Sequence, residues 1–476
     1  DVAQAAARAL GTIGSPAAAK ALLAALPKTS VANRLAVCEG LFRAAESLSR
    51  LNKPKVVRAI YDQLRKLDGP HQVRAGALRG AILLRGKDGL PILRESLRGP
   101  DNVLAAAAAR TALELPGSDV VPALAAELDQ LSADRQILVI QVLGRRGDPA
   151  ALPALASATR NRPNPVRLAA LRALPEIGDP SVVPVLVNLL LDTDTEVASV
   201  AQESLAALPG PSVDAAATKM LESDNAALRL TGLDLIGRRR ITTCMPALFQ
   251  ATEDPDAKVR SAAFKRLNEL GSPAEAAALL ERLLAAKEKS DIADAAQALA
   301  SACGRAKHPE AQAEQVVRAL PEAQPAQKVA LLGVLGSLGG LNSAQTVRAS
   351  LNDADPEIRT AALRALANWK TPDVAPDLFK LAQSTSNPSE RLLCLRAYLG
   401  WAANSELPAS RRLDLCREAA PVLQQPEEKK LLLAALGNLK SLEGLELIAP
   451  HLDSAATREE AAAATVATAD ELLKGD

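Results

Sequence analysis

The sequence predicts an all-α fold, an α-solenoid of about fifteen stacked helical hairpins. Three observations support this prediction: a repeat period, two helical patterns in each period, and alanine-rich helices that can pack closely. The period is read from prolines in similar apolar phrases, spaced by 31 residues three times and then by 62: Pro91, Pro122, Pro153, Pro184 and Pro246. A fixed period of this length is typical of repeat proteins.

A second phrase recurs between these prolines and indicates the number of repeats. Its clearest copies read Val-Arg-Leu-Ala-Ala-Leu-Arg-Ala-Leu at 166–174 and Ile-Arg-Thr-Ala-Ala-Leu-Arg-Ala-Leu at 358–366. Most copies start 30 to 33 residues apart, and wider spacings predict longer repeats or insertions near 45–72, 305–327 and 402–427. We therefore expect residues 1–476 to form one continuous solenoid.

Each repeat is predicted to contain two helices. Apolar residues return at i, i+3, i+4 and i+7 in both phrases, which is the spacing of an amphipathic helix. Asp148-Pro149 provides a capping side chain before a proline at the first helical position, and Gly178 is a predicted helix end. The recurrent proline early in the first helix should bend that helix. Alanine runs such as 105–109 favour helix and allow neighbouring helices to pack closely.

Composition disfavours several other classes of protein. Aromatic residues make up only 2% of the chain, which argues against a base-stacking groove, an aromatic-lined pocket and a β-sandwich core. Five cysteines in 476 residues are too sparse for a disulfide framework. No apolar run approaches the roughly 18 residues that a membrane span needs.

The two phrases together resemble the HEAT-repeat family, in its short bacterial form of about 30 residues per unit. The resemblance implies a right-handed superhelix with the second helices on the concave side. It also implies a ladder between repeats, built by an arginine at the second position of the second helix and an acidic residue before that helix. The arginines at this position are Arg34, Arg74, Arg167, Arg229, Arg260, Arg359, Arg391 and Arg458. The candidate acidic partners are Asp101, Asp224, Asp256 and Asp355. In four repeats another residue stands in place of the arginine: Leu104, Gln136, Ala198 and Ala293.

The stretch 411–464 is similar, more loosely, to the end of HEAT segments in large bacterial multidomain proteins. That similarity implies attached domains and an extracytoplasmic location, periplasmic or secreted. The chain starts inside a helical pattern at Val2, so we expect it to be a segment of a larger protein. Apolar stripes left uncovered at solenoid ends predict end-to-end self-association.

Residues that carry chemistry are few. His71, His308 and His451 are isolated, and the iron-binding His-Glu pairs of the hydroxylase that also uses HEAT repeats are absent from the sequence. We therefore predict no catalytic residue, no metal and no cofactor. The cysteines are predicted to be buried, and Cys394 with Cys416 is the one disulfide pairing that merits a test. The glycine-rich stretch 333–340 has no lysine, so it is interpreted as a helix end and not as a phosphate loop.

Charge is distributed unevenly along the chain. Residues 1–100 contain 17 Lys and Arg against 7 Asp and Glu, a balance of +10, whereas the remaining residues carry 39 against 48, a balance of −9. One predicted helix and its flanks could form an anion-binding patch, or an ordinary solvated face: Lys53, Lys55, Arg58, Arg65 and Lys66. The near-neutral net charge and the scarcity of aromatics in this region argue against nucleic acid as a partner.

Four of the eight aromatic residues fall within 33 residues: Trp369, Phe379, Tyr398 and Trp401. Because Trp and Tyr are enriched among interface anchors, this cluster predicts a partner-binding site. The alternative is that these side chains fill the wider gap beside the insertion that follows.

The sequence as a whole favours a non-enzymatic scaffold, whose long surface binds a protein partner or spaces attached domains. The alternative is a HEAT-like enzyme of the chromophore lyase or DNA glycosylase type, with its site in the concave groove. A basic, aromatic-lined inner groove with a buried carboxylate would favour the enzyme. A groove lined by small residues and dispersed charges would favour the scaffold.

Overall fold

The computed structural model describes residues 2–160 and 162–473, which form helices α1 to α29, joined by turns and short 3₁₀ helices, without any strand in this part of the chain. Contacts between Cα atoms divide the chain into two compact units, residues 1–239 and 240–476. In each unit, an odd-numbered and an even-numbered helix alternate along the chain. Within each unit, most odd-numbered helices pack against the neighbouring odd-numbered helices, and each even-numbered helix packs against the odd-numbered helix that follows it.

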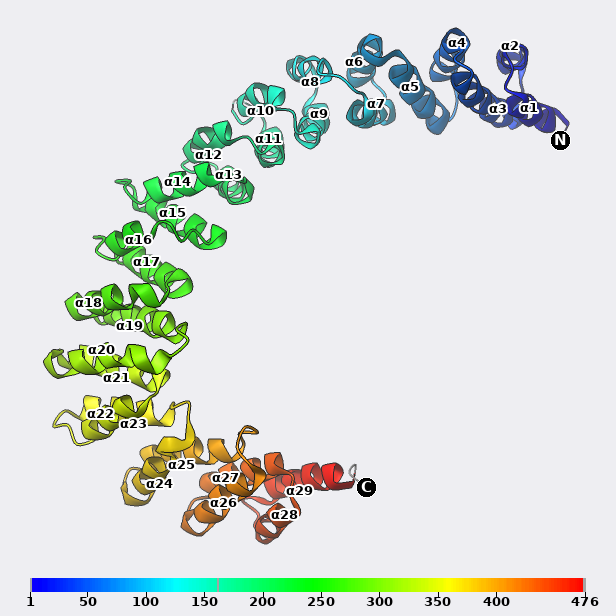
Figure 1. The fold of residues 1–476 in the computed structure, drawn as a ribbon. Helices are drawn as coiled ribbons and strands as arrows, with labels where there is room; N and C mark the ends of the chain where they lie inside the picture. Colours follow the sequence, from blue (N-terminus) through cyan, green and yellow to red (C-terminus); the bar gives the residue numbers. More distant parts are fainter. Residues whose placement is uncertain (1, 161, 474–476) are drawn as a thin grey trace. The chain divides into compact units, whose positions relative to one another are not determined.

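The first unit has two layers of helices (Figure 1). The odd layer contains α1 (Val2–Ile13), α3 (Val31–Arg50), α5 (His71–Arg85), α7 (Asn102–Glu114), α9 (Ala133–Arg146), α11 (Asn164–Ile177), α13 (Thr195–Ala207) and α15 (Ala226–Arg239). The even layer contains α2 (Pro16–Ala25), α4 (Pro54–Arg65), α6 (Leu90–Arg98), α8 (Val120–Ala125), α10 (Leu152–Ala158), α12 (Val183–Leu189) and α14 (Pro211–Met220).

The second unit repeats this arrangement. Its odd layer contains α17 (Ala257–Leu270), α19 (Lys289–Gly304), α21 (Pro325–Leu338), α23 (Pro356–Ala367), α25 (Pro388–Ala402), α27 (Pro426–Leu439) and α29 (Arg458–Leu473). Its even layer contains α16 (Met245–Ala251), α18 (Ala276–Ala285), α20 (Pro309–Ala319), α22 (Leu341–Ser350), α24 (Ala375–Ser384), α26 (Ala409–Ala419) and α28 (Leu442–Ile448). The predicted all-α solenoid architecture is confirmed, and the arginine phrase lies on the odd helices.

The recurrent proline acts differently from the prediction. Instead of bending one longer helix, it often follows a separate 3₁₀ turn: Pro180–Val182 forms such a turn, and α12 begins at Val183 with Pro184 in its first turn. The reason is that Asp179 caps the 3₁₀ turn, while proline has no N–H to continue the hydrogen-bond ladder. The 3₁₀ segments are Leu26–Lys28, Gly86–Gly89, Leu128–Gln130, Pro149–Ala151, Pro180–Val182, Pro273–Glu275, Leu320–Glu322, Pro372–Val374, Ala420–Val422 and Ala449–His451.

The core of each unit runs between its two layers and is built mainly from leucine, valine and alanine. Many of its alanines are fully buried, among them Ala44, Ala77 and Ala295. A methyl side chain lets adjacent helices approach at the short end of the usual interhelical range of about 8–10 Å. None of the described helices combines the length and the apolar character needed to cross a bilayer.

Candidate functional site in the groove beside α23

The predicted arginine ladder is present at four steps, where the guanidinium of one repeat reaches a carboxylate of the next. These pairs are Arg74 with Asp101 at 3.0 Å, Arg260 with Asp291 at 2.8 Å, Arg391 with Glu428 at 2.7 Å, and Arg167 with Asp192. Only Asp101 was among the candidate partners. Asp256 and Asp355 instead cap their own helices, accepting from the backbone N–H of Lys258 and of Glu357, each at 2.8 Å.

The other predicted ladder arginines donate to backbone carbonyls of the loops. Their acceptors are Asp68 for Arg34 at 3.2 Å, Ser223 for Arg229 at 2.8 Å, Asp353 for Arg359 at 2.8 Å, and Leu452 for Arg458 at 3.0 Å. The arginines at this position therefore share one structural role, which is to donate hydrogen bonds to polar groups between helices. Either a backbone carbonyl or a carboxylate can accept these bonds.

A second set of structural arginines, at the ends of odd helices, was not predicted from the sequence. Arg146 donates to the carbonyls of Ala112 at 2.6 Å and Leu115 at 2.9 Å, at the end of the preceding odd helix α7. Arg239 and Arg305 make the equivalent bonds to the ends of α13 and α17. The last carbonyls of a helix lack intrahelical donors, and the helix dipole favours a cation there. The signal in the sequence was a basic residue at the end of the second phrase.

Two of the four residues of the aromatic cluster lie in the core and not on the surface. Trp369 is only 4% exposed and Tyr398 only 1%, which contradicts their predicted role as surface anchors. The Tyr398 hydroxyl donates to the Glu418 carboxylate at 2.6 Å, and its ring stacks on Phe379 with centroids 4.8 Å apart. Burial, reinforced by the bond to Glu418, raises the pKa of Tyr398. Phe379 and Trp401 are half-buried, and a partner-binding role for these two residues stays a prediction.

The predicted basic patch is only partly assembled. Lys53, Lys55, Arg58 and Lys66 are exposed on α4 or at its ends. Arg65 is instead neutralised, because it pairs with Asp62 at 3.1 Å and lies 3.7 Å from Glu95. An anion-binding role for the four exposed cations stays a prediction.

All five cysteines are buried and carry reduced thiols: Cys38, Cys244, Cys303, Cys394 and Cys416. The Cys394–Cys416 pairing is therefore absent from this structure. Burial raises the pKa of Cys303 and of Cys394 to about 11, and that of Cys416 to about 12.

These thiols should be inert in the folded protein. A pKa of about 11 leaves roughly one thiol in a thousand ionised at pH 8, and the thiolate is the reactive form. We expect a chromogenic disulfide reagent to label the native chain at pH 8 far more slowly than the same chain unfolded in guanidinium, where all five should react. Labelling of the native protein as fast as that of the unfolded chain would contradict this burial.

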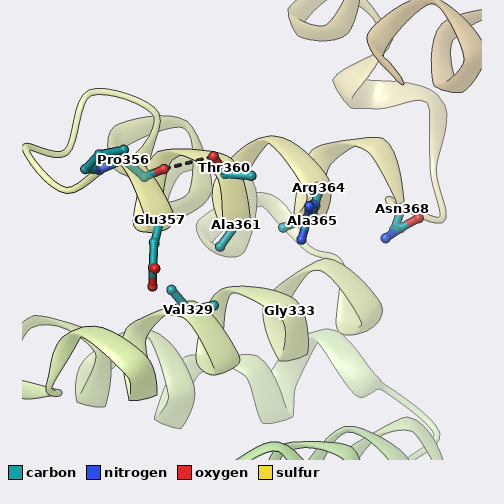
Figure 2. A pocket seen from close by; sticks show the side chains of 9 residues that line it. All are labelled: Val329, Gly333, Pro356, Glu357, Thr360, Ala361, Arg364, Ala365 and Asn368. Atoms are coloured by element: carbon teal, nitrogen blue, oxygen red, sulfur yellow. Dashed lines mark hydrogen bonds between the residues drawn. The ribbon is translucent and has the colours of Figure 1, made fainter. Parts of the chain in front are cut away.

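A cavity of about 510 Å³ lies between α21 and α23 of the second unit (Figure 2). Its lining residues are Val329, Gly333, Pro356, Glu357, Thr360, Ala361, Arg364, Ala365 and Asn368. In Figure 2, Glu357 and Ala361 are directed toward α21, Arg364 lies farther along the same edge of α23, and Asn368 lies at the end of that helix. We call this cavity the α23 groove.

A second cavity of about 300 Å³ lies on the other side of the first turn of α23 and shares Pro356 and Thr360 with the α23 groove. Its remaining lining comes from α22 to α25 and the loops between them: Leu351, Arg359, Leu363, Leu381, Thr385, Glu390 and Cys394. The two cavities therefore adjoin across one helical turn.

Local hydrogen bonds hold that turn in place. Asp355 caps α23 through the Glu357 N–H, and Pro356 occupies the first helical position, where proline needs no donor. Thr360 donates to the Pro356 carbonyl at 2.9 Å, and Arg359 donates to the loop carbonyls that precede the helix. The turn between the two cavities is thus rigidly built, although the sequence reasoning had placed no site there.

Two glycines of α21 face α23 in different ways. A Cβ added at Gly333 would meet nothing within 4 Å, so this position opens into the groove. A Cβ added at Gly336 would lie 2.9 Å from the Cα of Ala365, so α21 and α23 touch there through their backbones. The stretch 333–340 does include a helix end, since α21 ends at Leu338 and Gly339 and Gly340 have positive φ.

The chemistry available in the α23 groove is recognition by charge, hydrogen bonding and close approach. Glu357 and Arg364 are exposed and supply one carboxylate and one guanidinium, and Asn368 supplies an amide. Across residues 2–160 and 162–473, no three His, Cys, Asp or Glu side chains are grouped so that they could hold a metal ion.

Comparisons with known proteins agree with the repeat architecture. A family model described as HEAT repeats matches residues 121–206, 214–300 and 303–398, and one described as a PBS lyase HEAT-like repeat matches 2–26. No curated protein matches the chain.

Many solved structures are similar to this chain, at low identity. Importin beta is 11% identical, with 97% of this chain and 80% of that chain covered and a TM-score of 0.35. Human deoxyhypusine hydroxylase in complex with glycerol is 22% identical, with 60% and 97% covered and a TM-score of 0.24. Karyopherin Kap121p, bound to the extreme C-terminus of the protein phosphatase Cdc14p, is 12% identical, with 94% and 55% covered and a TM-score of 0.44.

The matches to the HEAT-repeat model together span more than half of the sequence, and they fall on hairpins whose two layers and arginine ladder the structure displays. The chain belongs to the HEAT-repeat family.

Proposed function

We propose that this chain is a protein-interaction scaffold that binds an extended polypeptide, from a partner or an attached domain, across α21, α23 and α25. The observation that carries the proposal is the pair of adjoining cavities, of about 510 and 300 Å³, on either side of the first turn of α23. Two adjoining cavities that share a rim suit a ligand long enough to cross from one to the other.

The lining of the α23 groove favours a scaffold over a HEAT-like enzyme. Its α21 side is Val329 and Gly333, and Ala361 and Ala365 lie opposite. An enzyme of the lyase or glycosylase type calls for a basic, aromatic-lined groove with a buried carboxylate, and the carboxylate here, Glu357, is exposed. Small side chains with dispersed charges instead let a polypeptide backbone approach closely.

Replacing Gly333 by leucine should block the groove without harming the fold. The new side chain has open space around its Cβ and projects into the cavity, and leucine is a better helix former than glycine by about 0.5–1 kcal/mol. Gly400→Leu on α25 is the matched control, because a Cβ there also meets nothing within 4 Å and Gly400 lines neither cavity. We expect proteins captured by the tagged wild-type chain from its own cells to be lost with Gly333→Leu and retained with Gly400→Leu.

The captured proteins are quantified by mass spectrometry, and direct binding of each candidate is then measured by calorimetry with the purified components. Equal retention of every captured protein by Gly333→Leu would remove the α23 groove from the binding surface. A wild-type chain that captures nothing beyond the empty resin would contradict the scaffold proposal itself.

A further inference from the structure

We infer that the α23 groove is a subsite for a polypeptide segment in an extended, polyproline-like conformation, which places a cationic side chain beside Glu357 and an anionic side chain beside Arg364. This inference rests on the proposed scaffold function and specifies the chemistry of what the scaffold binds.

The spacing of the two charges comes from the helix that carries them. Glu357 and Arg364 are seven residues apart on α23, which is two turns, so both lie on one face about 10.5 Å apart along the helix axis. That face borders α21, and Ala361 lies between the two charges (Figure 2). The groove therefore has a negative and a positive end with an apolar floor between them.

Both charges are available to a ligand. Among the described residues, neither the Glu357 carboxylate nor the Arg364 guanidinium forms an ion pair or a side-chain hydrogen bond, and both residues are exposed. Nearby arginines, in contrast, have partners within the protein. Arg359 donates to the carbonyls of Asp353 and Ala354, and Arg391 pairs with Glu428. Glu357 lies in the first turn of α23 and Arg364 in its last turn, where the helix dipole favours an acid and a base respectively.

The backbone of the ligand also finds partners in the groove. Gly333 carries no side chain where a Cβ would have open space, which allows a main chain to approach α21 closely. Asn368, at the end of α23, is exposed and offers an amide that can both donate to and accept from a peptide group. Glycine in the interior of a helix lowers its stability, so its presence at Gly333 is consistent with a requirement for space.

The charge spacing selects the conformation of the segment. In a polyproline II helix, side chains three residues apart lie on the same side, about 9.3 Å apart. In a β-strand, side chains on one side are about 6.7 or 13 Å apart. The spacing of Glu357 and Arg364 is matched best by a basic and an acidic residue three positions apart in the polyproline conformation.

The test uses the full chain and three fluorescent proline-rich peptides that differ only in two positions, three residues apart: one Lys and one Glu, two Glu, or two Lys. Fluorescence anisotropy at low ionic strength measures the Kd of each. The wild-type chain should bind the mixed peptide at least five-fold more tightly than the other two. Glu357→Arg should shift the preference to the two-Glu peptide, and Arg364→Glu to the two-Lys peptide. The preference should weaken at high salt, because the groove is exposed to solvent.

These reversals do not depend on the direction in which the peptide runs, and circular dichroism confirms that each variant is folded. Absence of a preference for the mixed peptide in the wild-type chain, or a preference unchanged by both reversals, overturns the inference. If Gly333→Leu removes the captured partners whereas both charge reversals retain them, the scaffold proposal stands and the charge-pair subsite is wrong.

Discussion

Glu428→Gln should lower the free energy of unfolding of the repeats around α27 by about 3 kcal/mol at pH 7, because it leaves the Arg391 guanidinium buried without its counter-charge. Arg391 donates to Glu428 at 2.7 Å and to the Val422 carbonyl at 2.6 Å, and it also donates to Ala382 at the end of α24. One guanidinium therefore joins three elements of the stack. The Glu428 side chain is only 3% exposed, so water cannot replace the lost partner.

This contribution should depend on pH. Burial raises the pKa of Glu428, but the opposing hydrogen bonds from Arg391 and from the Gln424 and Gln425 N–H groups outweigh burial and leave the pKa below its ordinary value. A carboxyl whose pKa is lowered in the folded state stabilises the protein above its unfolded pKa of about 4.3, and this stabilisation is lost as the pH falls through the folded value. The difference between wild type and Glu428→Gln should therefore shrink as the pH is lowered from 7 to 3.

Urea unfolding followed by circular dichroism at several pH values measures both effects. Glu427→Gln is the matched control, since Glu427 is the preceding residue and its side chain is 68% exposed. That variant should change stability by less than about 0.5 kcal/mol. Equal unfolding midpoints for wild type and Glu428→Gln at pH 7 would contradict the importance of this pair.

Gly336→Leu and Gly333→Leu should have opposite effects on stability, although they place the same side chain on the same helix three residues apart. At Gly336, a Cβ would lie 2.9 Å from both the Cα and the carbonyl oxygen of Ala365, so α21 and α23 must separate. Such overpacking costs typically about 1–3 kcal/mol, and we expect the upper end because backbone atoms are in the way. At Gly333 the Cβ meets open space, and the gain in helix propensity should stabilise the chain by about 0.5–1 kcal/mol.

Thermal unfolding of the two variants and the wild type gives the sign of each effect, and hydrogen exchange locates it. With Gly336→Leu, exchange should accelerate in α21 and α23, because each repeat of a solenoid is stabilised mainly by its neighbours. Gly336→Ala is the graded control, with a smaller loss expected than for leucine. Comparable stability of Gly336→Leu and Gly333→Leu would show that α21 and α23 do not touch at Ala365.

The α23 groove combines a helix that the sequence predicts with cavities that it does not predict. The helix that separates the two cavities was predicted from the phrase at 358–366, and the structure confirms it. The two cavities could not be predicted from the sequence, because they depend on which face of α23 meets its neighbouring helices. Trp369 and Tyr398 show the same limit: their spacing in the sequence suggested a surface site, and packing placed both in the core.

The sequence by itself determined the repeat period, the two helices of each hairpin and the position of the arginine phrase, because each of these depends on contacts between residues close in the chain. Only the tertiary structure decided which carboxylate meets Arg391, which of Gly333 and Gly336 faces open space, and that Arg146, Arg239 and Arg305 bind the preceding helix ends. These pairings join residues that are mostly about 30 or more positions apart, so they follow from the exact rotation and spacing of neighbouring hairpins. The periodicity of the sequence constrains that rotation only loosely, because an alanine-rich helix carries small side chains on several faces, and any of these faces can pack against a neighbour.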